Sequence, residues 1–279
     1  MGRRNKAVFL FVVLSLFLLS SCGGLSSGRS TAKKIALSAD LKPILLRTST
    51  FRLAGFYRFS KRGTPLTVYI EGDGLAWLTR YRPSADPTPK NPIALRLAAI
   101  DKSANVVYLA RPCQYVSLSE EKLCGVPYWT QKRFSKEVIV AVNEAINILA
   151  SKAGADRIHL VGYSGGGAVA ALAASRRKDI ASLRTVAGYM DHVSLNRKVG
   201  VSPLKGSLDP IRAAPYLKLI PQTHYTGDQD ERIPGWVAQN FRKAVGNNAC
   251  ASTRKVNATH EKGWERVWKK VWSDIPTCR

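Results

Sequence analysis

Arg157–Ala174 reads RIHLVGYSGGGAVAALAA, and this stretch decides the fold of the chain. Its first five residues are a short apolar run, which predicts a buried strand. Residues 167–174 are small and apolar, which predicts a helix. Between them lies Gly162-Tyr163-Ser164-Gly165-Gly166. A turn this tight requires residues without bulk beside Ser164, and it lifts the serine hydroxyl clear of the backbone.

A G-x-S-x-G between a strand and a helix resembles the nucleophile elbow of the α/β-hydrolases. This resemblance implies that Ser164 is a nucleophile. It also implies that the amide of Gly165, at the N-terminus of a helix, meets a developing oxyanion. The alternative is a glycine-rich turn that binds nothing. The flanking strand and helix favour the nucleophile.

Strand-like and helix-like segments alternate from residue 51 to the C-terminus. The strands are expected at 51–59, 66–70, 105–110, 158–161, 183–188, 222–226 and 253–256, and the helices at 91–100, 134–153, 210–217, 236–245 and from 264 onward. The alternation predicts an α/β fold with a mostly parallel central sheet and helices on both faces. Residues 191–209 offer the only room for a lid, so a small cap or none is expected. In the last helix, Trp264, Trp268 and Trp272 share one face and are expected in the core.

A serine nucleophile needs a base and an acid that orients the base. The histidines are His159, His192, His224 and His260. His159 and His224 lie inside apolar strand segments and are expected to be buried and structural. His260 follows the last expected strand, where an α/β-hydrolase presents its base. We therefore expect His260 to be the base.

The acid is expected in Gly227-Asp228-Gln229-Asp230-Glu231-Arg232-Ile233-Pro234, directly after the strand at 222–226. This segment resembles the G-x-x-D-x-x-[VI]-P turn of the α/β-hydrolases, whose register implies Asp230. The order Ser164, Asp230, His260 is also the order of that family. Asp228 and Asp191 are the competitors, and either could instead cap a loop.

The second oxyanion donor is expected in Glu71-Gly72-Asp73-Gly74, after the strand at 66–70. This loop departs from the H-G-G-G pattern of lipases. We expect the amide of Asp73 to be the donor, with Gly74 as the alternative. Because a carboxylate beside an oxyanion is unfavourable, Asp73 must point away or pair with a base such as Arg80 or Arg82.

Three segments resemble exported bacterial α/β-hydrolases: the loop at Glu71, residues 110–114 and residues 206–208. Two side chains of residues 110–114, Arg111 and Gln114, follow a strand end. They could line the pocket or shape a disulfide-closed loop.

The N-terminus carries Arg3, Arg4 and Lys6, followed by an apolar run at 7–19 that is too short to span a membrane as a permanent helix. Leu19-Ser20-Ser21-Cys22 resembles the lipobox of bacterial lipoproteins, which implies lipidation of Cys22; the alternative is a secretory signal with a free thiol. We therefore expect a lipoprotein signal peptide at 1–21, a tether and lead-in at 22–50 with a flexible glycine- and serine-rich part at 23–30, and an α/β-hydrolase domain at 51–279. The expected location is the bacterial cell envelope, at the periplasmic face of the inner or outer membrane.

Four further cysteines are Cys113, Cys124, Cys250 and Cys278. An even number in an exported protein favours disulfides, and the spacing suggests Cys113–Cys124 and Cys250–Cys278. No metal site is expected, because there is no C-x-x-C pair and no histidine nearby. No organic cofactor is implied either.

The formal net charge is +24, of which three charges lie on Arg3, Arg4 and Lys6. Export argues against nucleic acid as a partner. An anionic surface, such as lipid headgroups or cell-wall polymers, is one interpretation of the excess, and solubility is the other.

Together these features predict a membrane-anchored serine hydrolase that cleaves a small acyl ester, a lipid ester or a thioester. The alternatives are a non-catalytic binding or scaffold lipoprotein and an acyltransferase with the same triad.

Overall fold

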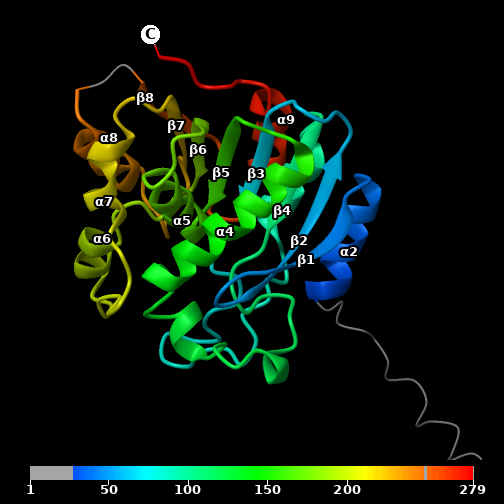
Figure 1. Ribbon diagram of the computed structural model, residues 1–279. Coiled ribbons are helices and arrows are strands. Elements are labelled where there is room, and N and C mark those ends of the chain that lie inside the picture. Colours follow the sequence, from blue (N-terminus) through cyan, green and yellow to red (C-terminus); the bar gives the residue numbers. More distant parts are fainter. Residues whose placement is uncertain (1–27, 248–249, 279) are drawn as a thin grey trace, which may run out of the picture.

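The computed structural model describes residues 28–247 and 250–278. The expected signal peptide, Cys22 and most of the expected tether lie outside these residues. Among the described residues, eight strands form one sheet in the order β1-β2-β4-β3-β5-β6-β7-β8 (Figure 1). They are β1 (Lys42–Arg47), β2 (Arg52–Phe59), β3 (Leu66–Ile70), β4 (Asn105–Leu109), β5 (Ile158–Tyr163), β6 (Ile180–Val186), β7 (Gln222–Gly227) and β8 (Ala251–Val256).

The sheet is parallel from β4 to β8, and its two antiparallel pairs, β1 with β2 and β2 with β4, lie at one edge. Every residue of β3 and β4 is buried, as expected for apolar strands covered on both faces. The mostly parallel α/β sheet predicted from the sequence is therefore confirmed.

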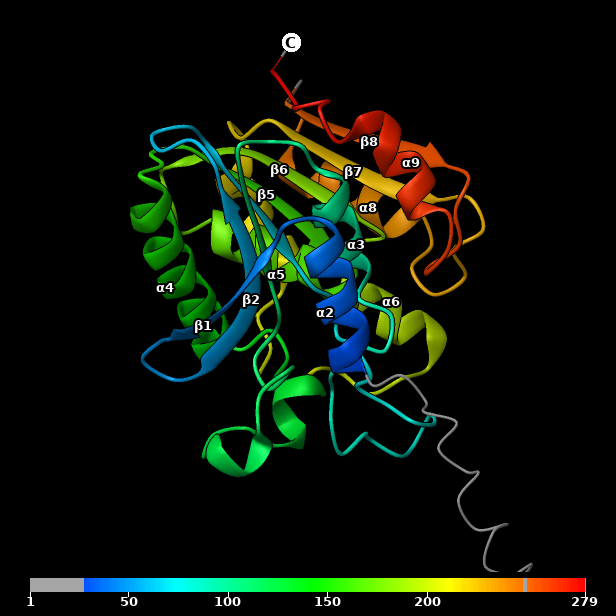
Figure 2. The same cartoon turned by 90° about the vertical axis from the view of Figure 1, so that its right-hand side faces the viewer.

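Helices cover both faces of the sheet, and each face has its own apolar core (Figure 2). One face carries α4 (Lys136–Ala153), α5 (Gly165–Ala174), α7 (Pro210–Ala213), η3 (Ala214–Leu217) and α8 (Trp236–Val245). The other carries α2 (Gly28–Ser38), α3 (Ile93–Ile100) and α9 (Trp264–Val271). All ten residues of α5 are buried, since its glycines and alanines allow close approach to the sheet. Trp264 and Trp268 are buried in the second core, as the sequence predicted, whereas Trp272 is half-buried against it.

The folded unit begins earlier than residue 51. Within the segment 22–50, expected as a tether and lead-in, α2 packs beside α3, and β1 pairs with β2 from Lys42↔Tyr57 to Arg47↔Arg52. Ala32 and Ala36 lie one turn apart on α2, and both are buried. Ala32 and Ala36 thus form the packing face of α2. The glycine- and serine-rich residues beside them had indicated a tether instead.

The segment between β6 and β7 is more ordered than the loop expected at 191–209. It contains α6 (His192–Val199), which ends at Gly200 in the left-handed conformation. No separate cap domain covers the sheet within the described residues. The remaining short helices are η1 (Leu118–Glu120) and η2 (Val126–Trp129), between β4 and α4.

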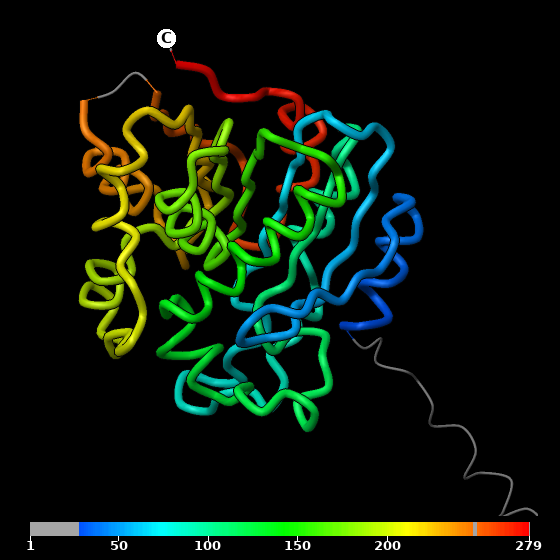
Figure 3. Tube along the Cα trace, in the orientation of Figure 1, coloured from blue at the N-terminus to red at the C-terminus, as the bar shows by residue number. Residues whose placement is uncertain are grey.

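Both expected disulfides, Cys113–Cys124 and Cys250–Cys278, are present. After α9 the chain runs back along one end of the molecule towards the start of β8 (Figure 3). The Cys250–Cys278 bond fastens the C-terminal segment there. Among the helices of the described ranges, none combines the length and apolar character needed to cross a bilayer.

Candidate active site

Ser164 lies at the turn from β5 to α5, with a strained backbone at φ 50° and ψ −119°. The surrounding glycines are required by close backbone contacts. A Cβ on Gly162 would lie 2.3 Å from the carbonyl oxygen of Gly166, and one on Gly166 would lie 2.2 Å from that of Ile70. The amide of Ser164 donates to Val186 O on the neighbouring strand β6. The turn therefore holds Ser164 in the elbow conformation expected from the sequence.

The structure brings Ser164, His260 and Asp230 together from three separate loops. Ser164 Oγ lies 3.1 Å from His260 Nε2, and His260 Nδ1 lies 2.9 Å from Asp230 Oδ2. The His260 side chain is 12% exposed and the Asp230 side chain is fully buried. Each contact is within hydrogen-bonding distance, so the three side chains form a continuous chain from a hydroxyl to a buried carboxylate.

The other oxygen of Asp230 is fixed by backbone amides of its own turn. Oδ1 accepts from Arg232 N at 3.0 Å and from Ile233 N at 2.9 Å. The two competitors have other partners: Asp191 caps α6 through Ser194 N, and Asp228 accepts from Ala258 N. Of the three candidate acids, only Asp230 contacts the ring of His260.

The loop that carries His260 is held through its backbone. Tyr163 Oη and Trp264 Nε1 both donate to the carbonyl oxygen of His260, at 3.0 and 2.9 Å. The Tyr163 ring also packs against the imidazole, with ring centroids 5.5 Å apart. Tyr163, next to Ser164, therefore helps to hold the loop of His260 in place, a role that its position in the pentapeptide did not indicate.

The remaining histidines bond elsewhere. His159 Nδ1 contacts Ser182 Oγ at 2.8 Å, and His224 is bonded to Thr185 and Gln222. Burial lowers the pKa of both His159 and His224 to about 4, so both are neutral at pH 7. His224 is fully buried, as expected, whereas His159 is half-buried. His192 is buried as well, and its Nε2 lies 3.1 Å from Leu208 O.

The loop after β3, Glu71–Gly74, also lies beside the elbow. Gln114 Nε2 donates to Gly72 O at 3.0 Å, and Gln114 Oε1 accepts from Arg111 N at 3.1 Å. Because C=O and N–H point in opposite directions across a trans peptide, this bond fixes the direction of the Asp73 amide. Neither that amide nor the amide of Gly74 has a backbone acceptor within the described part of the chain. Both amides therefore remain candidates for the oxyanion donor.

The Asp73 side chain lies against the elbow, where a Cβ on Gly165 would be 2.0 Å from Asp73 Oδ1. It does not pair with Arg80 or Arg82. Oδ1 lies 3.3 Å from Arg111 Nη1, and Oδ2 lies 2.5 Å from Arg133 Nη1. Arg80 instead donates to Gly200 O. The expected partners are wrong, because the 74–88 loop carries Arg80 and Arg82 away to the surface.

The two arginines are held in place by the segment ahead of α4. Arg111 is buried, donates to Arg133 O and packs over the Phe134 ring at 5.5 Å. Burial lowers the pKa of Arg111 to about 10, which leaves it charged at pH 7. Two cations thus offset the Asp73 carboxylate beside the elbow. No sequence pattern pointed to Arg133, which lies 60 residues from Asp73.

We expect Arg133→Ala to lower kcat for a soluble ester about tenfold to a hundredfold, because the Asp73 carboxylate would then oppose a developing oxyanion. Asp73→Asn in the same chain should restore most of the loss, which steady-state kinetics on the single and double variants would measure. Arg254→Ala, which removes an exposed paired arginine, is the control. An equal loss in the single and double variants would contradict this electrostatic role.

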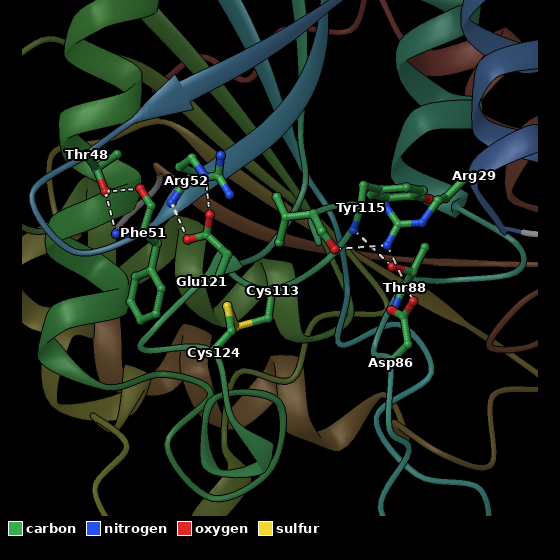
Figure 4. Close-up of a disulfide and its surroundings, with 11 residues drawn as sticks. Arg29, Thr48, Phe51, Arg52, Asp86, Thr88, Cys113, Tyr115, Glu121 and Cys124 are labelled. Carbon is green, nitrogen blue, oxygen red and sulfur yellow. Dashed lines mark hydrogen bonds and ion pairs between the residues drawn. A yellow bond between two sulfur atoms is a disulfide. The ribbon is translucent and has the colours of Figure 1, made fainter. Parts of the chain in front are cut away.

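The loop that carries Arg111 and Gln114 is fastened at several points (Figure 4). The Cys113–Cys124 disulfide closes it, and Glu121 forms an ion pair with Arg52 on β2. Next to Gln114, Tyr115 N donates to Thr88 Oγ1 at 2.9 Å. The sequence left open whether Arg111 and Gln114 line the pocket or shape this loop. Gln114 lies inside the disulfide-closed loop and Arg111 lies just ahead of it, and both contact the Glu71–Gly74 segment.

Glu71 is the first residue of the loop after β3, and it is buried. Its Oε1 accepts from Gly72 N at 2.9 Å and from Ala94 N, near the start of α3, at 3.4 Å. Its Oε2 has no hydrogen-bond partner among the described residues. Burial raises the pKa of Glu71 to about 7, so the carboxyl is partly protonated at neutral pH.

The raised pKa of Glu71 predicts a pH-dependent stability. The folded chain keeps a proton that the unfolded chain releases above the ordinary glutamate pKa of 4.5, so the free energy of unfolding should fall as the pH rises from about 4.5 to about 7. Glu71→Gln should flatten this part of the profile in urea unfolding between pH 5 and pH 8. Glu231→Gln, at an exposed site, should not. An unchanged slope in Glu71→Gln would show that Glu71 is not the titrating group.

No group of three or more His, Cys, Asp or Glu residues that could hold a metal ion occurs in the described ranges. The site combines a hydroxyl next to an imidazole with a buried carboxylate behind the imidazole.

No family model and no curated protein matches the sequence. Solved structures do match the fold. An esterase of Pyrococcus furiosus is 16% identical with a TM-score of 0.56, over 85% of this chain and 95% of its own. A membrane phospholipase A, described as a bacterial virulence factor, is 15% identical with a TM-score of 0.58, over 96% and 95%. Est1E from Butyrivibrio proteoclasticus is 13% identical with a TM-score of 0.54, over 84% and 98%.

These matches cover nearly the whole length of each protein, and they establish the architecture. At identities this low, the similarity concerns the fold alone. The chain has the α/β-hydrolase fold.

Proposed function

We propose that this chain, an α/β-hydrolase by fold, is a serine hydrolase that cleaves an ester or a thioester. Ser164 Oγ attacks the acyl carbon while His260 Nε2 takes its proton. His260 then returns the proton to the leaving alkoxide or thiolate. Water, deprotonated by the same ring, attacks the acyl-enzyme and releases the acid, which restores Ser164. Asp230 keeps the proton on Nδ1 and stabilises the imidazolium.

The oxyanion is proposed to bind between the amides of Gly165 and Asp73. The Gly165 amide is the first of helix α5, where N–H groups have no intrahelical acceptor. The Asp73 amide is directed by the bond from Gln114 to Gly72 O. Fixed donors on both sides of the forming oxyanion contribute more than flexible ones, because they need no reorganisation during the reaction.

One observation carries the proposal: the continuous contact from Ser164 through His260 to Asp230. Similar folds host unrelated activities, so the fold is a weaker argument than the site. The test is labelling with a fluorophosphonate, which reacts with an activated serine. The parent chain should be labelled and Ser164→Ala should not. Absence of labelling in the correctly folded parent would favour a non-catalytic scaffold.

We also propose that a lipid anchor holds the protein in the bacterial cell envelope. The apolar run at 7–19 and Cys22 at the end of the lipobox-like segment support a lipid anchor in the bacterial cell envelope. Mass spectrometry of the protein from membranes would reveal an acylated N-terminal Cys22. An unmodified thiol at Cys22 would exclude the anchor without affecting the proposed reaction.

A further inference from the structure

The 74–88 loop displays large apolar side chains to solvent. The exposed fractions are 41% for Trp77, 45% for Leu78 and 84% for Tyr81. Leu78 N donates to Arg82 O at 2.8 Å, and Trp77 pairs with Pro83 in a β-bridge, so the loop is a formed turn. The five other tryptophans of the chain are buried or half-buried. Trp77 is therefore placed unlike any other tryptophan in this protein.

The end of α6 lies beside this turn. Arg80 Nη2 donates to Gly200 O at 3.2 Å, which joins the two segments into one surface. Val199 and Val201, on either side of Gly200, are 52% and 41% exposed. Clustered apolar exposure of this kind marks an interaction site more often than isolated exposed residues do.

The two segments of this surface are basic, and the acid at the end of the 74–88 loop, Asp86, pairs with Arg29. Neither residues 74–85 nor residues 192–208 include aspartate or glutamate. The exposed cations in these segments are Arg80, Arg82, Arg197, Lys198 and Lys205. We call these five residues together with Trp77, Leu78, Tyr81, Val199 and Val201 the apolar–basic patch.

The patch lies at the end of the sheet that carries the candidate active site, which we call the active-site edge. Its first segment follows Asp73 directly, and its second follows Asp191 after β6, where parallel strands end. The first described helix, α2, also begins near this edge. Arg29 pairs with Asp86 at the end of the 74–88 loop and donates to Val116 O (Figure 4).

We propose that the apolar–basic patch binds an anionic lipid surface and so turns the active-site edge towards that surface. Tryptophan and tyrosine favour the membrane interface, aliphatic side chains enter the acyl boundary, and arginine and lysine pair with anionic headgroups. A nucleic acid or an acidic protein would use the cations but would leave Leu78, Val199 and Val201 in water. The lipid surface accounts for both halves of the patch.

This inference deepens the proposed function, because an ester embedded in the lipid would be presented to Ser164. Contact with lipid does not depend on catalysis, however. Ser164→Ala should bind vesicles as the parent does, so failure of the reaction and failure of the contact are distinguishable.

The direct test uses the full chain and the emission of Trp77. Vesicles contain phosphatidylcholine alone, or phosphatidylcholine with phosphatidylglycerol, each with brominated acyl chains that quench tryptophan in contact with them. We expect quenching in the anionic vesicles and loss of most of it in Trp77→Phe. This readout reports contact by the patch even where another part of the chain also holds the protein on the vesicle. Equal quenching in the parent and Trp77→Phe would overturn the proposal.

The second measurement is the affinity of the protein for anionic vesicles. Arg80→Ala with Arg82→Ala should weaken binding to anionic vesicles about tenfold to thirtyfold, since each cation near such a surface contributes about 1 kcal/mol. The charge-matched control is Lys269→Ala with Lys270→Ala on α9. The apolar control is Tyr216→Ala with Leu219→Ala, both highly exposed ahead of β7, at the opposite edge of the sheet. A loss as large in the controls would contradict the patch. Binding of a single-stranded RNA through Arg80 and Arg82, without lipid quenching, would assign it to nucleic acid instead.

Discussion

Replacing Ser164 by alanine should lower kcat for short p-nitrophenyl esters by at least about 1,000-fold. The Ser164 hydroxyl is the atom that would form the acyl-enzyme, and no other hydroxyl is found bonded to His260 Nε2 in the described ranges. Water would have to attack without covalent catalysis, which leaves only the stabilisation by the oxyanion donors. The release of p-nitrophenolate, followed in single-turnover and steady-state experiments, measures the loss.

Ser182→Ala is a matched control for this variant. It also removes a serine hydroxyl bonded to a histidine ring, because Ser182 Oγ lies 2.8 Å from His159 Nδ1. That pair lies within β5 and β6, and burial holds His159 neutral. Its removal should affect stability rather than kcat. Unchanged turnover in Ser164→Ala would exclude Ser164 as the nucleophile.

Asp230→Asn should lower kcat by about 10,000-fold with little change in the fold. The asparagine oxygen can still accept from Arg232 N and Ile233 N, so the turn is kept. Its amide nitrogen would donate to His260 Nδ1 and place the ring proton on Nε2. In that tautomer His260 cannot accept a proton from Ser164. The kcat of the purified variant, with circular dichroism as the check on folding, measures the effect.

Asp228→Asn separates the role of Asp230 from a general loss of charge in the same turn. Asp228 accepts from Ala258 N, and asparagine can accept the same bond. We expect this variant to keep kcat within about threefold of the parent, in the range of substitutions outside an essential network. A larger loss in Asp228→Asn than in Asp230→Asn would reassign the acid.

The features that were predictable from the sequence are those fixed by local chain geometry. The elbow at Ser164 and the turn at Asp230 depend on a few neighbouring residues, since glycine and proline restrict what the backbone can adopt. Strand and helix patterns reflect burial that repeats along one element. Ser164, Asp230 and His260 each follow a predicted strand, and they occur in the chain order of the α/β-hydrolases.

Other features depend on contacts between segments that are distant in sequence. The ion pair of Asp73 with Arg133 joins residues 60 positions apart, and nearer arginines were the natural candidates. The antiparallel β1 needed β2 as a partner before its residues could be recognised as a strand. No short sequence pattern predicts either the ion pair of Asp73 with Arg133 or the pairing of β1 with β2.

By itself, then, the sequence determined the α/β architecture, suggested the two disulfide pairs and favoured the three residues of the candidate triad. The tertiary structure decided which side chains lie around this site: Arg111 and Arg133 beside Asp73, Gln114 on Gly72, and the buried Glu71 at the start of the same loop. The physical reason is that the charge and the protonation of a buried group depend on everything packed around it. That packing is established only when the chain has folded.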